Sequence, residues 1–114
     1  MPRDDATLLD IALAARRIIE FREKLDKEAF IRDIKTRSAV MLQLMVIGEA
    51  VKRLSAEFRE RHPEIPWTVI ACMRDTLIHE YDGVDFDEVF KTAVSDVPEL
   101  LSQVERIMEE ERRG

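Results

Sequence analysis

The sequence predicts an all-α protein, an up-and-down bundle of about four to six helices, on the strength of three observations. Apolar residues recur at three- and four-residue steps along almost the whole chain. Hydrophobic residues make up 46% of the 114 residues and charged residues 37%, with only three glycines and four prolines, a composition typical of helix-rich soluble bundles. This length provides for one core, so we expect a single domain over residues 1–114.

The first helix is predicted over about residues 5–25. Its apolar side carries Leu8, Ile11, Ala15, Ile18 and Leu25. Asp26 then has the position of an N-cap for a short helix near residues 27–33.

The clearest pattern lies in a long helix predicted from about Lys35 to Arg61. Its apolar stripe has steps of four and three residues and consists of Val40, Leu44, Ile47, Val51, Leu54 and Phe58. A second stripe beside it indicates contacts on two sides, either as the central helix of the bundle or at a dimer contact. Gly48 in mid-helix costs about 1 kcal/mol relative to alanine, which suggests that another helix approaches closely there.

The second half of the chain divides at its prolines. The segment 62–66 is predicted to be a turn, and the next helix runs from near Pro66 to about Tyr81. Asp85 and Glu88 have the spacing of a capping box at the start of a further helix, and Pro98 opens the last one.

Cysteine usage and hydropathy indicate a cytoplasmic protein without a membrane segment. Cys72 is the only cysteine, which excludes an internal disulfide, and we interpret it as a core residue. The apolar stretch 8–15 contains Asp10, unlike a signal peptide. The most apolar run, residues 39–47, is far shorter than the roughly 20 residues that span a bilayer.

The charge of −6 is unevenly distributed. Residues 1–62 hold 13 Lys and Arg against 11 Asp and Glu, whereas residues 63–114 hold 5 against 13. Proteins that bind nucleic acids usually present a basic field, so this distribution counts against a nucleic-acid partner for the second half.

The sequence lacks the motifs that several kinds of catalytic site require. The sequence has no glycine-rich phosphate loop, no Cys/His cluster with metal spacing and no Gly-x-Ser-x-Gly elbow, so we predict neither a metal nor a cofactor. The remaining candidate is the segment 73–81, MRDTLIHEY. On an ideal helix Arg74 and Tyr81 lie near the apolar face, whereas His79 points about 140° away from Arg74.

Spacing alone leaves structural roles open for these residues. An arginine at an apolar face needs an anionic partner, and Glu49 is the candidate for a purely structural ion pair. His79 can be an exposed residue that interacts favourably with the helix dipole, although Asp75, one turn earlier, can also orient the imidazole. His62 is interpreted as a turn residue.

The pattern Arg74-x-x-x-x-His79-x-Tyr81 matches the motif of the HEPN superfamily, and its flanks resemble the HepT-like branch. The matching flanks are Ile-Gly-Glu-Ala at 47–50, Pro-Glu-Ile-Pro-Trp at 63–67 and Gly-Val-Asp at 83–85. The similarity covers nearly the whole chain. One difference is Asp75, where many relatives carry asparagine.

This resemblance implies a ribonuclease toxin paired with a nucleotidyltransferase-fold antitoxin that can attach AMP to Tyr81. His79 would act as base or acid and Arg74 would stabilise the phosphorane, without a metal. Tyr81 would hydrogen-bond a phosphate or the histidine, and Asp75 and Glu49 would support the site. In the family two motifs face each other across a two-fold axis, so the resemblance implies a homodimer.

RNA would be bound by cations of the first half, chiefly Arg37, Lys52 and Arg53. Two alternatives stay open. The protein can be a non-catalytic helical partner that presents Tyr81 to a nucleotidyltransferase, or a dimeric bundle whose Arg74 pairs only hold the dimer together.

Overall fold

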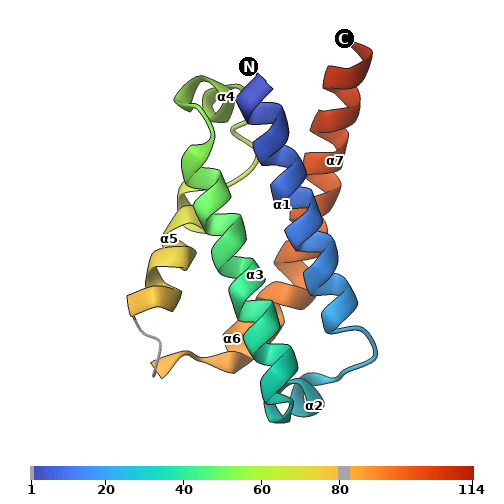
Figure 1. Cartoon of the computed structure of the whole chain (residues 1–114), viewed down its shortest axis with the longest axis vertical. Coiled ribbons are helices and arrows are strands. Elements are labelled where there is room, and N and C mark those ends of the chain that lie inside the picture. Colours follow the sequence, from blue (N-terminus) through green and yellow to red (C-terminus); the bar gives the residue numbers. More distant parts are fainter. Residues whose placement is uncertain (1, 80–82) are drawn as a thin grey trace.

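The computed structural model describes residues 2–79 and 83–114, which form helices and connecting turns without a strand among them (Figure 1). This confirms the predicted all-α bundle. A five-residue π-helical turn, η2 (Thr92–Asp96), joins the last two helices. The helices are α1 (Pro2–Phe21), α2 (Lys27–Arg32), α3 (Ile34–Arg53), α4 (Ala56–Arg61), α5 (Trp67–His79), α6 (Phe86–Lys91) and α7 (Val97–Arg113).

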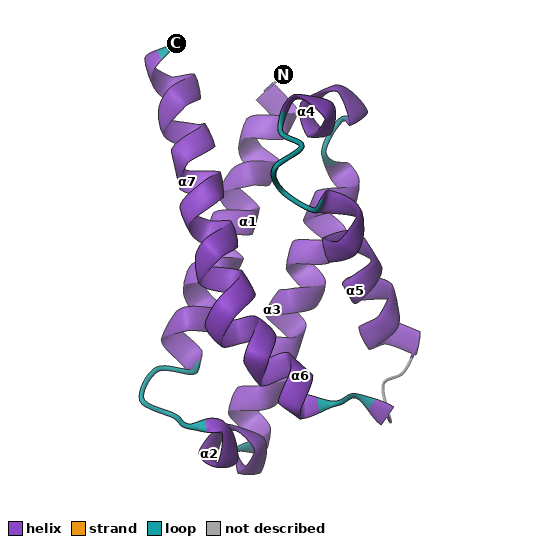
Figure 2. Ribbon diagram, turned by 180° about the vertical axis from the view of Figure 1, so that it is seen from behind, coloured by secondary structure: helices purple, strands orange, loops and turns teal. Residues whose placement is uncertain are grey.

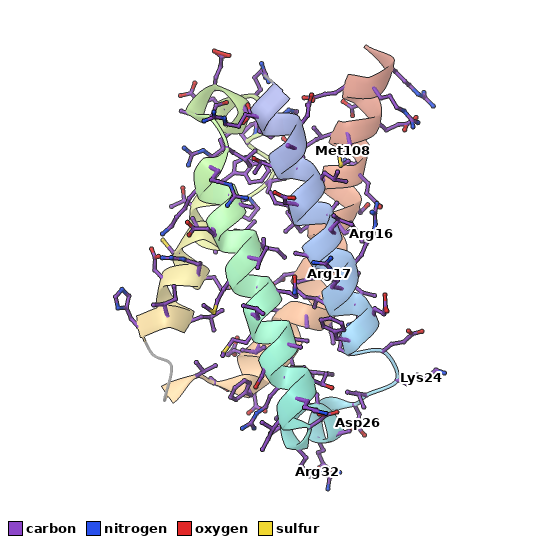
Figure 3. All side chains as sticks on the ribbon, in the orientation of Figure 1. Arg16, Arg17, Lys24, Asp26, Arg32 and Met108 are labelled. Atoms are coloured by element: carbon purple, nitrogen blue, oxygen red, sulfur yellow. The ribbon has the colours of Figure 1, made fainter. Side chains whose placement is uncertain are left out.

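The four longer helices alternate in direction, so the bundle has up-and-down topology (Figure 1). Helix α3 lies between α1 and α5, and α7 packs on α1. Seen from behind, α6 continues through η2 into α7 on the face opposite α3 (Figure 2). Arg16 of α1 reaches α7 (Figure 3), where its Nη2 atom is 2.6 Å from Glu105 Oε2.

The core is built from the stripes that the periodicity predicts. Burial of such aliphatic or aromatic side chains contributes about 1.5–3 kcal/mol each. On α1 the buried residues include Leu8, Ile11, Ala15 and Ile18. The stripe in the middle of the chain is fully buried as well and consists of Val40, Leu44, Ile47, Val51, Leu54 and Phe58.

The predicted long helix from Lys35 to Arg61 is wrong in one respect, because it is interrupted. Leu54 is extended (φ −66°, ψ 141°), and Ser55 caps α4 with its Oγ atom 3.1 Å from Phe58 N. Asp4 of α1 causes the corner by accepting hydrogen bonds from Ser55 N at 3.0 Å and Ser55 Oγ at 2.8 Å. A side chain distant in sequence therefore takes the backbone donor that a continuous helix would use.

The Asp4 carboxylate at this corner is buried yet ionised. Burial acts to raise its pKa, but the hydrogen bonds from the Ser55 backbone and hydroxyl, together with Arg61, hold the pKa of Asp4 below its ordinary value. The charge is thus compensated where the chain turns from α3 into α4.

The predicted N-caps are present, whereas the bounds of the first helix and the burial of Cys72 differ from the prediction. Asp26 accepts a hydrogen bond from Ala29 N and Asp85 accepts from Asp87 N and Glu88 N, as expected of N-caps. The first helix, predicted over residues 5–25, begins at Pro2 and ends at Phe21. The interpretation of Cys72 as a core residue is wrong, because its side chain is exposed on the outer side of α5.

Two further predictions concern the helix end near Tyr81 and the presence of membrane-spanning segments. The predicted end, near Tyr81, of the helix expected to start near Pro66 lies outside the described residues. Among the described helices, none is both long and apolar enough to cross a bilayer.

Candidate functional site

The site is built where α5 crosses α3 at Gly48. A Cβ atom added at Gly48 would lie 2.2 Å from Arg74 Cβ, far inside normal contact distance, and 3.2 Å from the Ile70 carbonyl oxygen, which is a tight contact. The close approach predicted from this mid-helix glycine is therefore confirmed. The missing side chain allows the α5 backbone to bring Arg74 down onto the surface of α3.

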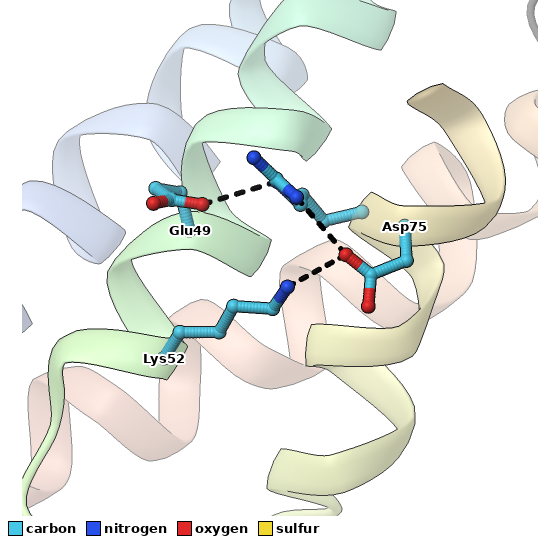
Figure 4. A network of polar contacts seen from close by, with 4 residues as sticks. Glu49, Lys52 and Asp75 are labelled. Atoms are coloured by element: carbon cyan, nitrogen blue, oxygen red, sulfur yellow. Dashed lines mark hydrogen bonds and ion pairs between the residues drawn. The ribbon is translucent and has the colours of Figure 1, made fainter. Parts of the chain in front are cut away.

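Arg74 is held there by carboxylates on both helices (Figure 4). Its Nε atom is 3.0 Å from Glu49 Oε2, and its Nη1 atom is 3.0 Å from Asp75 Oδ1. The ion pair with Glu49 that the sequence suggested is present. Neither contact uses the Nη2 group, and the side chain is 30% exposed, so the guanidinium is fixed without being closed off.

Asp75 joins Arg74 to a second cation. Its Oδ1 atom also lies 2.6 Å from Lys52 Nζ, so one carboxylate oxygen accepts from both basic groups (Figure 4). The hydrogen bond from Lys52 and then that from Arg74 lower the pKa of Asp75. In this network two cations face two carboxylates, and the formal charges cancel.

The structure does not join His79 to this network. His79 is the last residue of α5 and is exposed. Within the described ranges it forms no hydrogen bond or ion pair with Arg74 or Asp75, and Asp75 serves Lys52 and Arg74 instead. This agrees with the helical-wheel expectation that His79 and Arg74 diverge in one chain. Tyr81 lies outside the described residues.

The cations predicted to bind RNA are dispersed along α3. Only Lys52 is part of the site. Arg53 pairs with Asp10 of α1 at 3.3 Å, and Arg37 lies over the Phe86 ring at 4.3 Å while donating to the Ile31 carbonyl. Arg37 and Lys52 are 15 residues apart, about 22 Å along a helix.

Sequence reasoning missed one role at the site, the bridging of Lys52 and Arg74 by Asp75. Glu49 and Lys52 are three residues apart on α3, a spacing that places them on one side of the helix. That spacing was the available signal, but the register between α3 and α5 was needed to see which residues of α5 meet them. His62 Nδ1 lies 3.7 Å from Glu64 Oε2, and the imidazole packs at a tilt against the Phe58 ring, which is consistent with a residue of the turn.

The described residues contain no group of three His, Cys, Asp or Glu side chains arranged to hold a metal ion. The network itself provides a held guanidinium and an ammonium group, and an exposed imidazole lies at the end of α5.

Comparison with known proteins assigns the family. Residues 11–107 match the family model described as "Ribonuclease HepT-like". A protein of Thermococcus cleftensis named as a probable ribonuclease HepT is 45% identical over 100 residues, covering 88% of this chain and 91% of the relative. A protein of Methanocaldococcus jannaschii provisionally named an RNase is 42% identical over 112 residues, covering 96% and 97%.

A third relative, from Caldanaerobacter subterraneus subsp. tengcongensis and also provisionally named an RNase, is 43% identical over 95 residues, covering 83% of this chain and 85% of its own. No solved structure is a significant match. The family match and these identities extend over most of the helical bundle, including the crossing of α3 and α5. The chain therefore belongs to the HepT-like ribonucleases of the HEPN superfamily, the family that its Arg74-to-Tyr81 motif and flanking segments indicated.

Proposed function

We propose that this protein is the toxin of a cytoplasmic toxin–antitoxin pair. In this proposal residues 1–114 act as one helical domain that cleaves RNA internally without a metal, using Arg74, His79 and Tyr81. The observation that supports it most directly is the state of Arg74, whose guanidinium is held by Glu49 on the neighbouring helix and still keeps an exposed edge.

Metal-independent cleavage of RNA needs three things: a base for the 2′-hydroxyl, an acid for the leaving 5′-oxygen and positive charge at the phosphorane. Arg74 supplies the charge, and its anchoring by Glu49 means that little side-chain freedom is lost when a phosphate binds. The exposed His79 supplies the proton transfers. Tyr81 hydrogen-bonds a phosphate oxygen or the imidazole.

One chain offers only one histidine suited to these transfers, and it points away from Arg74. His62 belongs to the turn before α5 and is engaged with Phe58 and Glu64. A two-fold dimer removes both difficulties, because it places His79 of one protomer opposite Arg74 of its partner and brings two imidazoles to one cleft. The functional unit in this proposal is therefore a homodimer.

RNA must compete with Asp75 for the cations of the site. A phosphate that enters takes the place of the Asp75 carboxylate on Lys52 Nζ and on the Arg74 guanidinium, which makes Lys52 the RNA-contacting lysine of the network. Arg37 and Arg53, which contact Phe86 and Asp10 respectively in the free protein, would meet the RNA strand outside the network of Arg74 and Lys52.

The proposed antitoxin is a nucleotidyltransferase-fold protein that attaches AMP to Tyr81. This part of the proposal rests on the family resemblance of the motif. A nucleotide on the tyrosine hydroxyl adds bulk and negative charge two residues from His79, where the RNA backbone has to lie, and so blocks cleavage.

Cleavage of a labelled RNA in the presence of EDTA tests the nuclease. We expect His79→Ala to lower the rate by about 100-fold or more, the usual scale of general acid–base catalysis. Arg74→Ala should lower it by a similar factor and Tyr81→Phe by less. Arg16→Ala, which removes an exposed arginine from the α1–α7 ion pair, is the matched control and should cleave like the wild type. Equal rates for wild type and His79→Ala would refute the assignment.

A second function is favoured by the charge distribution: a non-catalytic partner that presents Tyr81 to the nucleotidyltransferase. The acidic second half and the cancelled charges of the site do not hinder such a role. Mass spectrometry of the protein produced together with its antitoxin distinguishes the two. An AMP-sized addition to Tyr81 in a chain that never cleaves RNA supports the partner, whereas cleavage by the unmodified chain supports the nuclease.

A further inference from the structure

The flank of α5 that is turned toward α7 borders a hollow of about 350 Å³ between α5 and the start of α7. Its apolar lining includes Val69, Ile70 and Met73 of α5 and Val97 and Leu100 of α7. A second hollow of about 430 Å³ shares Val69, Met73 and Thr92 with the first and continues it toward α6. We call the two together the α5–α7 groove. Figure 2 views the molecule from the side on which α5, α6 and α7 lie.

The groove is open at its centre. Val69 is 68% exposed, the highest value among the large hydrophobic side chains that the structure describes, and it borders both hollows. A trough between two helices accepts the apolar ridge of a third helix, whose side chains fit between theirs. The shape therefore favours a helical occupant that covers Val69 and Met73.

Charge narrows the choice of occupant. Among the described residues, five carboxylates rim the groove, Glu64, Asp96 and Glu99 around the first hollow and Asp85 and Glu88 around the second, and no described lysine or arginine lines either hollow. Such a rim repels the phosphates of RNA. It also repels the same groove of a second copy, because a two-fold contact would oppose identical acidic rims.

We propose that the α5–α7 groove docks a basic amphipathic helix of a partner protein. The occupant carries apolar residues at i, i+3 or i+4, and i+7, which cover Val69 and Met73, and lysine or arginine on both flanks, which pair with the acidic rim. The groove is separate from the nuclease site, since Val69 and Arg74 are about 140° apart around an ideal helix. The proposal does not depend on the nuclease mechanism.

The test measures binding of a fluorescein-labelled, 18-residue leucine/lysine model helix to the full chain by fluorescence anisotropy, beside a matched leucine/glutamate helix. We expect saturable binding of the lysine helix and at least tenfold weaker binding of the glutamate helix. Val69→Gln should weaken binding of the lysine helix at least fivefold. Leu9→Gln, at a 45% exposed position of α1, is the matched control and should not change it.

The rim is tested by the double variant Asp96→Asn/Glu99→Gln, which should weaken binding several-fold and flatten its salt dependence. Glu20→Gln/Glu23→Gln removes the same charge from exposed positions at the end of α1 and in the turn that follows it, and should have no such effect. Circular dichroism establishes that each variant is folded, and methyl NMR of the wild type shows independently whether the helix perturbs Val69 and Val97.

Several results would overturn the proposal. These are absence of saturable binding, equal binding of the two model helices, and equal weakening by the groove variants and their controls. Val69 and Val97 methyl shifts that change with protein concentration alone would instead assign the groove to a second copy. Shifts produced by an RNA oligonucleotide would assign it to nucleic acid.

Discussion

The two sides of α5 are built on opposite principles. Toward α3 the helix is in backbone contact at Gly48, and its charged residues are paired across the crossing. Toward α7 it borders an apolar groove with an acidic rim and a largely exposed valine. The difference teaches that contacts with α3 fix the position of α5, while the side toward α7 offers a surface for a binding partner.

The largest expected effect comes from adding a methyl group at Gly48, where α3 and α5 cross. In most helices Gly→Ala stabilises by about 1 kcal/mol, but Gly48→Ala should destabilise by about 1–3 kcal/mol because its Cβ collides with Arg74. Urea unfolding measures the change. Gly83→Ala is the control, since a Cβ there meets nothing within 4 Å. A more stable Gly48→Ala protein would show that α5 is not seated on α3 as described.

Neutralising one carboxylate on each side of α5 tests whether the charges at the crossing and at the groove differ in their effect on RNA binding. Asp75→Asn releases Lys52 and Arg74, so we expect RNA to bind about three- to tenfold more tightly at low salt, with a salt slope steeper by roughly one counterion. Glu99→Gln makes the same change of charge at the groove. Filter binding over a salt series should show no comparable gain for it, and equal gains for both variants would mean that only net charge matters.

Truncation of Val69 in the groove should change the stability of the protein only slightly. Val69→Ala is expected to change the free energy of unfolding by no more than about 0.5 kcal/mol, because the valine is mostly exposed in the free protein. The same urea titration measures it beside Gly48→Ala. A loss of several kcal/mol would mean that the groove is already filled, by the chain itself or by a second copy.

The smallest expected effect is the pH dependence of the stability that the ion pairs of Asp75 contribute. The pKa of Asp75 lies below its ordinary value of 3.8, because Lys52 and Arg74 donate to the carboxylate. Its contribution to stability is therefore complete above pH 3.8 and is lost as the pH falls through the lowered pKa. Melting temperatures of wild type and Asp75→Asn should differ by a constant amount from pH 7 to about 5 and converge below pH 4. A difference that already disappears near pH 6 would point to another group.

Much of the fold followed from local pattern. The buried stripes of α1 and α3, the N-caps Asp26 and Asp85 and the role of Gly48 were all predictable, because periodicity, capping and glycine are read within a few residues of the chain. The break at Ser55 was not, because the apolar spacing continues through it and its cause is Asp4, 51 positions earlier. Cys72 was misplaced because a small thiol is equally at home in a core or on a helix surface.

The sequence by itself determined the all-α class, the composition of the core and, through the motif and its flanks, the ribonuclease family. Only the tertiary structure decided which charged groups Asp75 meets. Whether Asp75 orients His79 or bridges Lys52 and Arg74 depends on the register of α5 against α3, set by a contact at Gly48 between residues 26 positions apart. The groove depends likewise on how far α5 stands from α7, a distance that the packing of side chains from separate helices determines and that no local pattern encodes.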